Sequence, residues 1–381
     1  MVLRVVINPD ILIWAREVAG FELDDAAARI GTSPKRLSEW EQGLSSPTVR
    51  QLRLIGKVYR RPSAFFYLEK SPDKPIELAD FRVMADTILS KSPELLYEIR
   101  RTRSRRITAL ELLSEMEEQP AEFELRFDLG DKPSVIAGRI REALGVNQEA
   151  QMGWRNHYEA LREWIKSIER LGILVCQFGG INVQEARGFA IDEQPLPVVA
   201  INAKDSPRGR IFTLFHELAH IVLHCGGLCD LHDEQNTDGD LEPLCNQVAG
   251  EALVPASVLL AQNEVISNTI LTWSDENLEI LASRFMVSRE VILRRLLTLG
   301  RSTQHFYRTK RKQFLEEYAS RKTGGFLEYF RRVLRDNGLA YTSIVMNAFH
   351  NDVITEMDVS RFLGDIKLKH VDSIQQELGL A

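Results

Sequence analysis

The chain has 381 residues, which is long for one domain and favours two or three domains. Hydrophobic residues make up 44% and charged residues 27% of the sequence, the balance of a globular protein rather than of a disordered chain. A net charge of −6 excludes a protein that is basic throughout, but it leaves room for a local basic patch.

The N-terminal segment carries the pattern of five short helices. Ser33 and Pro34 begin the third of them, with a hydroxyl cap followed by proline at the first helical position. The predicted helices cover residues 9–19, 24–30, 33–42, 47–59 and 62–69. Short helices with a tight turn before the third favour a helix-turn-helix domain, to which we assign residues 1–70.

Residues 71–130 are predicted to form a helical linker. Pro72 and Pro75 indicate an irregular start, and helical spacing then runs from Pro93 to about Glu118. This helix carries a dense run of arginines over residues 100–106. The arginines could extend a DNA-binding surface, or they could form a solvated face that pairs with nearby glutamates.

The pattern changes in the next segment, residues 131–262. A helical run over 134–171 is followed by three short runs rich in β-branched residues, which predict strands. The predicted strands cover residues 173–178, 188–191 and 198–202, and the helices after them cover 210–224 and 241–253. Residues 263–381 read as a C-terminal helical region.

The helix predicted over 210–224 contains an H-E-x-x-H motif, His216-Glu217-Leu218-Ala219-His220. Residues four apart lie about 40° apart around a helix, so the two imidazoles project to one side and can share a zinc ion. The Glu217 carboxylate lies next to the first ligand, where it can take a proton from the attacking water.

Two histidines leave zinc short of ligands, so a third must come from elsewhere. The best candidate is Glu242, which begins a helix and has Asn246 four residues on, on the same helix face. Asn246 can then bond the far nitrogen of a ligand histidine and fix its tautomer. Asp238 and Asp240 could compete for the ligand role, but neither has such a helical partner.

Other histidines and cysteines leave alternatives open. His224 could line the cleft and stabilise an oxyanion, or it could bond a carbonyl at the helix end. Cys225 and Cys229, with His232 nearby, could form a second zinc site or remain two reduced loop cysteines. Cys245 is predicted to be a small buried residue.

The chain lacks the marks of export. Four cysteines in so long a chain are not a disulfide framework. No apolar run approaches the roughly 18–20 residues that span a bilayer, and the N-terminus lacks the apolar core of a secretory signal. We therefore expect a cytoplasmic protein with no membrane partner.

The segments RGRIFTLFHELAHIVLH, VVAIN and CNQVAGEALVP resemble the ImmA/IrrE-type zinc metallopeptidases over about residues 170–260, and residues 281–300 resemble the segment after the catalytic core of that family. The resemblance implies Zn²⁺ bound by His216, His220 and Glu242, with Glu217 serving catalysis. At Leu244 the family often has a second acidic residue. Family members act inside bacteria by cleaving a helix-turn-helix repressor, which relieves transcriptional control of stress or mobile-element genes.

The N-terminal segment SPKRLSEWEQGLSSPTVRQLRLIGKVYRRP is similar to the phage-repressor-type helix-turn-helix domains of the xenobiotic-response-element class. The resemblance implies that the third helix enters the major groove of DNA. The candidate base readers are Ser33, Lys35, Arg36 and Ser38, and the candidate phosphate contacts are Arg50 and Lys57. Asp24 and Asp25 stand where such domains often have glutamine, so a protein-docking or dimerising domain is the alternative.

The expected fold is mostly α with a small β-sheet: a five-helix helix-turn-helix domain, an α+β zincin-like metallopeptidase core and a C-terminal helical region. The expected function is a zinc-dependent endopeptidase that cleaves a repressor-type helix-turn-helix protein. Strand 198–202, if it lies at the sheet edge, could pair with an extended substrate. The rival function is a DNA-binding transcription regulator whose zinc is structural or sensory. A homodimer is a further possibility.

Overall fold

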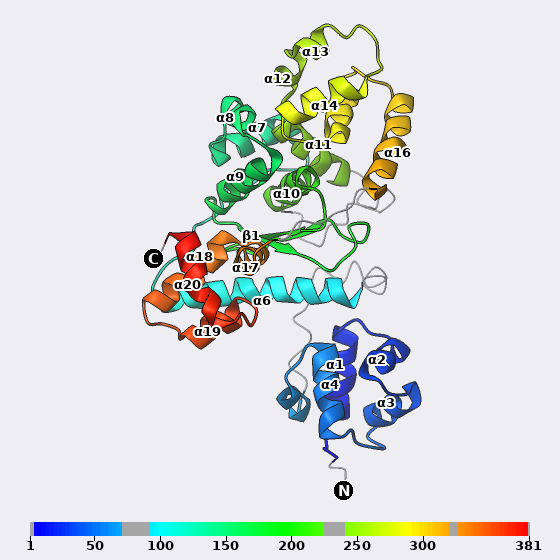
Figure 1. Cartoon of the computed structure of the whole chain (residues 1–381), viewed down its shortest axis with the longest axis vertical. Coiled ribbons are helices and arrows are strands. Elements are labelled where there is room, and N and C mark those ends of the chain that lie inside the picture. Colours follow the sequence, from blue (N-terminus) through cyan, green and yellow to red (C-terminus); the bar gives the residue numbers. More distant parts are fainter. Residues whose placement is uncertain (1–3, 71–91, 225–240, 321–326, 380–381) are drawn as a thin grey trace. The chain divides into compact units, whose positions relative to one another are not determined.

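The chain divides into two compact units, residues 1–101 and 102–381. A computed structural model describes residues 4–70, 92–224, 241–320 and 327–379 (Figure 1). The structure is mostly helical, with one small sheet in the second unit, which confirms the predicted fold class. None of the helices in these four ranges combines the length and the apolar character that a bilayer span requires.

The first unit contains the predicted helix-turn-helix elements. They are α1 (Pro9–Val18), α2 (Leu23–Ile30), α3 (Pro34–Glu41), α4 (Val49–Tyr59) and the 3₁₀ helix η1 (Ser63–Tyr67). The fifth predicted helix is thus one short 3₁₀ piece. Ser33 caps α3 as predicted, since its Oγ accepts a hydrogen bond from Arg36 N over 3.3 Å.

An ion pair between the half-buried Arg16 and the buried Glu41 joins α1 to α3. Arg16 Nε donates to Glu41 Oε1 over 2.7 Å, and Arg16 Nη2 donates to Glu41 Oε2 over 3.2 Å. The remaining guanidinium nitrogen donates to the carbonyl of Phe21 over 3.0 Å. Removal of Arg16 would leave the buried Glu41 carboxylate without its compensating charge, which would destabilise the first unit.

The sheet of the second unit has three strands, β1 (Leu174–Phe178), β2 (Gly188–Ile191) and β3 (Val198–Asn202). The spatial order is β1–β3–β2, with β3 parallel to β1 and antiparallel to β2. The suggestion that strand 198–202 lies at an edge is therefore wrong. The chain crosses over after β1, places β2 on the far side and returns to lay β3 between the two.

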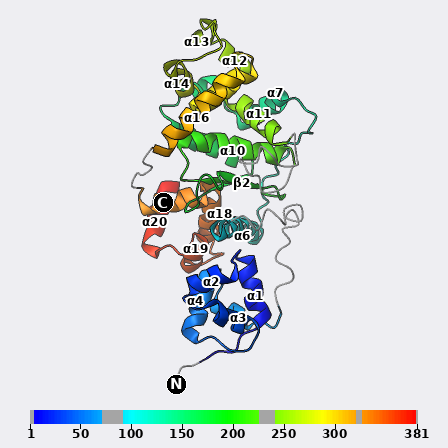
Figure 2. The same cartoon turned by 90° about the vertical axis from the view of Figure 1, so that its right-hand side faces the viewer.

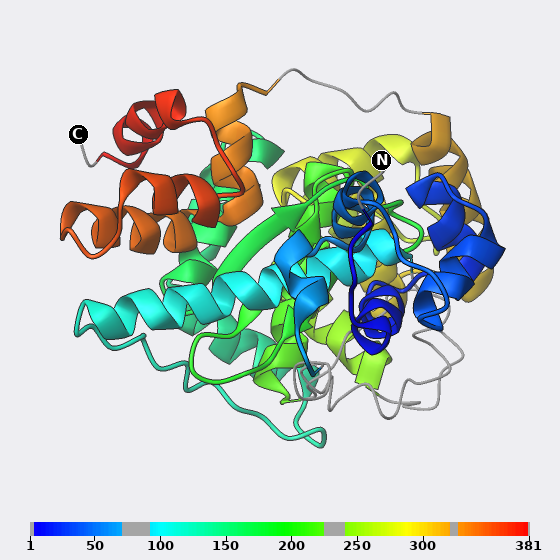
Figure 3. The ribbon, with the colours of Figure 1, turned by 90° about the horizontal axis from the view of Figure 1, so that it is seen from below.

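Helices cover both faces of this sheet. Helix α10 (Pro207–Val222) packs on one face, against β2 and β3. The other face carries the part of α6 (Pro93–Glu115) that begins at Thr102, as Figures 1 and 2 show from two sides and Figure 3 shows from below. Thr102 Oγ1 lies 3.7 Å from Cys176 Sγ of β1.

The arginine run of α6 serves the fold. Arg105 and Arg106 are buried. Arg106 donates to Glu193 Oε2 over 2.8 Å and to the carbonyls of Pro195 and Leu196 over 2.8 and 3.1 Å. The expectation of a solvated face is therefore wrong for these two arginines, although Arg106 does pair with a glutamate as expected. Their burial also leaves them unavailable to extend a DNA-binding surface. Their helix lies against the sheet, and the Arg106 side chain donates to acceptors of the loop between β2 and β3.

The predicted helical run over 134–171 is three helices, α7 (Pro133–Leu144), α8 (Gln148–Gly153) and α9 (His157–Glu169). Asn147 and Asn156 cap the second and third helices through their side-chain oxygens. The apolar spacing alone predicts one continuous helical run, but these two caps begin new helices within it.

The remaining helices follow the sheet and α10 in sequence. They are α11 (Leu241–Leu253), α12 (Ala256–Leu260), α13 (Asn263–Ile266), α14 (Asp275–Arg284), α15 (Arg289–Thr298), α16 (Gln304–Ser320), α17 (Tyr329–Asn337), α18 (Leu339–His350), α19 (Glu356–Phe362), the 3₁₀ helix η3 (Leu368–His370) and α20 (Val371–Leu378).

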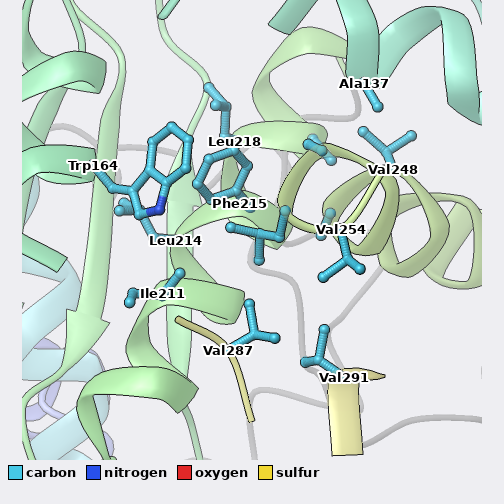
Figure 4. Close-up of a cluster of buried hydrophobic side chains, with 14 of the residues drawn as sticks. Ala137, Trp164, Ile211, Leu214, Phe215, Leu218, Val248, Val254, Val287 and Val291 are labelled. Carbon is cyan, nitrogen blue, oxygen red and sulfur yellow. The ribbon is translucent and has the colours of Figure 1, made fainter. Parts of the chain in front are cut away.

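The main hydrophobic core surrounds α10 and α11. Trp164 of α9 meets Phe215 of α10 edge to face, with ring centroids 4.8 Å apart, and Val248 of α11 lies in the same cluster (Figure 4). Residues of α7, α14 and α15 complete it. The two helices that carry the sequence-predicted metal ligands are therefore held by the most extensive apolar packing in the described part of the chain.

The C-terminal helices close the β1 side of the sheet. Gly338, between α17 and α18, has φ +83°, and an added Cβ would collide with the carbonyl oxygen of Val175. The buried carboxylate of Glu169 accepts a hydrogen bond from Ala340 N over 3.0 Å, at the start of α18. Burial raises the pKa of Glu169 to about 7, although backbone hydrogen bonds oppose the shift.

Candidate metal centre

Helix α10 begins earlier than the sequence predicts. Ser206 caps it, with its Oγ accepting from Gly209 N over 3.0 Å, and Pro207 occupies the first turn. The same Ser-Pro signal begins α3. The resulting helix is buried over residues 213–222, so the motif histidines lie in the interior rather than on the surface.

The structure brings His216, His220 and Glu242 together. Glu242 Oε2 lies 3.2 Å from His216 Nε2, and Glu242 Oε1 lies 3.3 Å from His220 Nε2. The two Nε2 atoms are 3.0 Å apart. Within the described residues, these three are the group whose ligand atoms all lie within 4.8 Å of one another, close enough to share one metal ion.

The protonation states suit a divalent cation. Burial lowers the pKa of the His216 imidazole, although Glu242 opposes the shift. For Glu242, burial raises the pKa, but the hydrogen bonds and charges of the two histidines outweigh it and lower the pKa to about 2. Two imidazole nitrogens and one carboxylate are a donor set that zinc prefers.

Glu217 lies between α10 and β2. The side chain is fully buried. A Cβ added at Gly188 of β2 would come within 3.2 Å of Glu217 Oε1 and 2.5 Å of Thr213 Cγ2. Only glycine lets the strand approach the helix this closely, so β2 is the strand that lies beside the candidate base.

The far nitrogens of the two histidines have different surroundings. Cys245 Sγ lies 3.4 Å from His220 Nδ1. Asn246 lies near His216 and acts to raise the pKa of its imidazole, yet His216 Nδ1 has no partner in hydrogen-bond geometry among the described residues. Sequence reasoning missed the contact between Cys245 and His220, although the position of Cys245 three residues after Glu242 places both on one side of the helix.

His224 has a partner that the sequence did not suggest. Its Nδ1 lies 3.2 Å from Asp192 Oδ2, directly after β2. The expected contact of His224 with a helix-end carbonyl is thus replaced by a contact with a carboxylate. Burial raises the pKa of Asp192, although His224 opposes the shift.

The candidate DNA contacts lie on the first unit. Lys35, Arg36 and Arg50 are exposed, and so is Lys57. Ser33 is exposed but its oxygen caps α3, while Ser38 Oγ accepts a hydrogen bond from Gln42 Nε2 over 3.0 Å. Asp24 and Asp25 are exposed on α2.

Part of the predicted chemistry falls in a segment that the structure does not describe. These residues are Cys225, Cys229, His232, Asp238 and Asp240, along with residues 71–91 of the predicted linker.

Two family models match the chain. A peptidase M78 model, described as an IrrE N-terminal-like domain, matches residues 168–297, which hold the sheet, α10 and α11. A helix-turn-helix model matches residues 12–66. No curated protein matches the chain. The two matches lie in separate segments of the chain, and together they are the combination of a helix-turn-helix domain and an IrrE N-terminal-like peptidase domain that the sequence predicts.

Proposed function

We propose that this chain is a zinc-dependent endopeptidase in which His216, His220 and Glu242 hold the metal and Glu217 is the catalytic base. The observation that carries the proposal is the convergence of Glu242 on the two Nε2 atoms, at 3.2 and 3.3 Å, beside the buried Glu217. The match of residues 168–297 to a peptidase family supports it.

The donor set favours a catalytic site over a structural one. Structural zinc sites are closed by four protein ligands, whereas catalytic sites keep a position open for water and substrate. Three ligand groups converge here among the described residues. Cys245 lies on the Nδ1 side of His220, away from the Nε2 atom that faces Glu242, so its sulfur does not complete the set.

The reaction is hydrolysis of a peptide bond. A bound zinc ion supplies Lewis-acid chemistry, which polarises a carbonyl oxygen and acidifies water. Glu217 accepts a proton from the attacking water and delivers it to the leaving amine. Burial of Glu217 keeps bulk water away from this transfer.

We assign substrate alignment to β2 in place of β3. The strand β2 is paired on one side by β3, and it lies beside Glu217 through Gly188. An extended peptide added along β2 would pass the base and the metal ligands with main-chain recognition and little demand on sequence.

The substrate we propose is a helix-turn-helix repressor of a bacterial stress or mobile-element circuit. The argument rests on the fusion of a helix-turn-helix domain to a peptidase-type domain. Residues 1–70 would bring the enzyme to its target, by holding DNA near the repressor or by pairing with the repressor's own similar domain. The exposed Lys35 and Arg36 at the start of α3 support the first route.

The test compares wild type with Glu217→Gln on repressor-type proteins encoded beside this chain. The variant keeps the shape of the side chain but cannot take the proton, so cleavage should fall by at least about 100-fold while zinc stays bound. Cleavage by the variant at the wild-type rate would refute the assignment of Glu217. Full zinc binding with no cleavage by the wild type would favour a sensory or structural metal in a transcription regulator.

A further inference from the structure

Helix α11 carries the proposed ligand Glu242. It also places side chains near the Nδ1 side of the proposed α10 ligands His216 and His220. Glu242 is the ligand, and Cys245 and Asn246 follow three and four residues later. Around a helix, these two positions lie about 60° to one side and about 40° to the other side of Glu242. They therefore flank the direction in which Glu242 reaches the metal ligands.

The Cys245 side chain is fully buried and His220 is 1% exposed. The Sγ–Nδ1 distance of 3.4 Å is within hydrogen-bond reach for sulfur. On the opposite edge of the same ring, His220 Nε2 lies 3.3 Å from Glu242 Oε1. Each nitrogen of His220 thus faces its own side chain from α11, a carboxylate at one nitrogen and a thiol at the other.

This arrangement decides where the imidazole proton resides. A metal ion takes the lone pair of Nε2, so the single proton of the neutral ring must sit on Nδ1. A thiol sulfur is a weak acceptor that can take that proton in a hydrogen bond. A buried N–H without any acceptor would carry the penalty of an unsatisfied donor.

We propose that Cys245 is a positioning residue for the metal centre: it accepts a hydrogen bond from His220 Nδ1–H and so holds the ring with Nε2 toward the metal. The inference rests on the metal site of the proposed function, but not on peptide cleavage. The Cys245 contact is with His220, whereas Asn246 of the same helix lies near His216, so the two histidines have different neighbours on α11.

The test measures the zinc affinity of the full chain by competition with a chromophoric chelator. Cys245→Ala should lower the affinity by about 10–100-fold, as loss of a residue behind a metal ligand does. Cys245→Ser keeps an acceptor and should lie closer to wild type. Cys176→Ala is the matched control, because Cys176 is also a buried cysteine but contacts Thr102. It should cost folding stability without changing zinc affinity.

Three results would overturn the inference. The alanine variant could bind zinc as tightly as wild type, serine could be no better than alanine, or Cys176→Ala could weaken zinc equally. A separate measurement uses cobalt in place of zinc to test whether the Cys245 sulfur is itself a ligand. A sulfur-to-cobalt charge-transfer band that Cys245→Ala abolishes would make the sulfur a ligand and also contradict the inference.

The two proposals fail separately. A protein that cleaves nothing, yet loses zinc affinity in Cys245→Ala and regains it in Cys245→Ser, keeps this inference and loses the peptidase. A protein that cleaves its substrate and binds zinc equally well with alanine at this position keeps the peptidase and loses this inference.

Discussion

In the proposed metal site, Glu217 and Glu242 are carboxylates with different tasks. Glu242 faces both Nε2 atoms, and the two histidines lower its pKa to about 2, so it is charged near neutral pH and suits a cation. Glu217 lies buried beside β2, where a carboxylate can exchange protons with a reacting water. In the proposed mechanism, one motif therefore supplies the base, and a separate helix supplies the charged ligand.

Zinc affinity should separate Glu242 from its neighbour Asn246. Glu242→Ala removes a charged ligand atom, whereas Asn246→Ala removes only a contact behind His216, so the first change should lower zinc affinity far more than the second. For Asn246→Ala we expect a loss of about 10–100-fold, measured by chelator competition. Unchanged zinc binding in Glu242→Ala would point to Asp240 or Cys229 as the third ligand.

For single residues, the sequence predicts the features that depend on the spacing of residues within one helix. The H-E-x-x-H spacing and the helix that starts at Glu242 are local patterns, and the structure brings these residues together. The contacts of Cys245 with His220 and of Asp192 with His224 depend on how separate elements meet. The spacing from Glu242 places Cys245 on the same side of its helix, but the partner that each side chain meets on another element required the structure.

At the scale of elements, the close approach of β2 to α10 is the feature most open to test. Gly188→Ala should push the Thr213 and Glu217 side chains away from β2. The expected loss in the free energy of unfolding is about 1–3 kcal/mol. The rate of peptide cleavage should also fall, because Glu217 would be displaced. In the Gly188→Ala background, Thr213→Ser removes the Thr213 methyl group, which lies nearest to the added Cβ, and should recover part of the lost stability.

The control for that substitution is Gly138 of α7, where an added Cβ meets nothing within 4 Å. Gly138→Ala should stabilise the protein by up to about 1 kcal/mol, because alanine favours a helix interior. Chemical denaturation and peptide cleavage measure both changes. A neutral Gly188→Ala would mean that β2 and α10 are not closely packed.

Glu169 should make the attachment of the C-terminal helices sensitive to pH. Its folded pKa of about 7 lies above the usual carboxyl value of about 4.3, so the folded state binds the proton more tightly. The stabilisation is complete below the unfolded pKa and is lost as pH rises through 7. The free energy of unfolding should therefore fall between pH 5 and pH 8.

Glu169→Gln keeps an oxygen that can accept from Ala340 N but removes the titration, so it should flatten this dependence. Glu142→Gln is the control, since the Glu142 side chain is 69% exposed and pairs with Arg139 on its own helix. Urea denaturation at several pH values gives the comparison. An equal pH slope in wild type and Glu169→Gln would contradict the account.

The order of the strands shows where sequence reasoning stops at this scale. Each strand was predicted to within one residue, because β-branched runs between turn residues are a local signal. Whether a strand is central or at an edge depends on pairing, and the three strands are all fully buried and alike in pattern. Burial on every side removes the alternation that would mark an exposed strand.

For the whole molecule, the central test concerns the ligand of the first unit. If it binds DNA through α3 and α4, affinity for a duplex fragment should fall with salt, with a log–log slope of about −0.9 per neutralised phosphate. Arg50→Ala should then weaken binding and reduce the slope by about 1. Arg139→Ala removes an exposed arginine of the second unit and should change neither.

Asp24 and Asp25 are exposed, and substitutions there should affect DNA binding in the opposite direction to Arg50→Ala. Converting both to asparagine should strengthen DNA binding if α2 faces phosphate. Docking to another helical domain would instead show little salt dependence, because its energy comes mainly from apolar burial. The domain's fold followed from caps and glycine stops, but its ligand does not, since one helix-turn-helix fold serves both purposes.

The ligand helices α10 and α11 are also the centre of the main hydrophobic core. Metal occupancy and folding are therefore thermodynamically linked: an ion that binds only the folded chain adds about 4 kcal/mol when its concentration is 1,000 times its dissociation constant. A chelator would withdraw that stabilisation from the whole second unit. Loss of activity in a chelator, the usual sign of a metalloenzyme, would here report unfolding as well as missing chemistry, and only readdition of zinc to a protein still folded by circular dichroism separates the two.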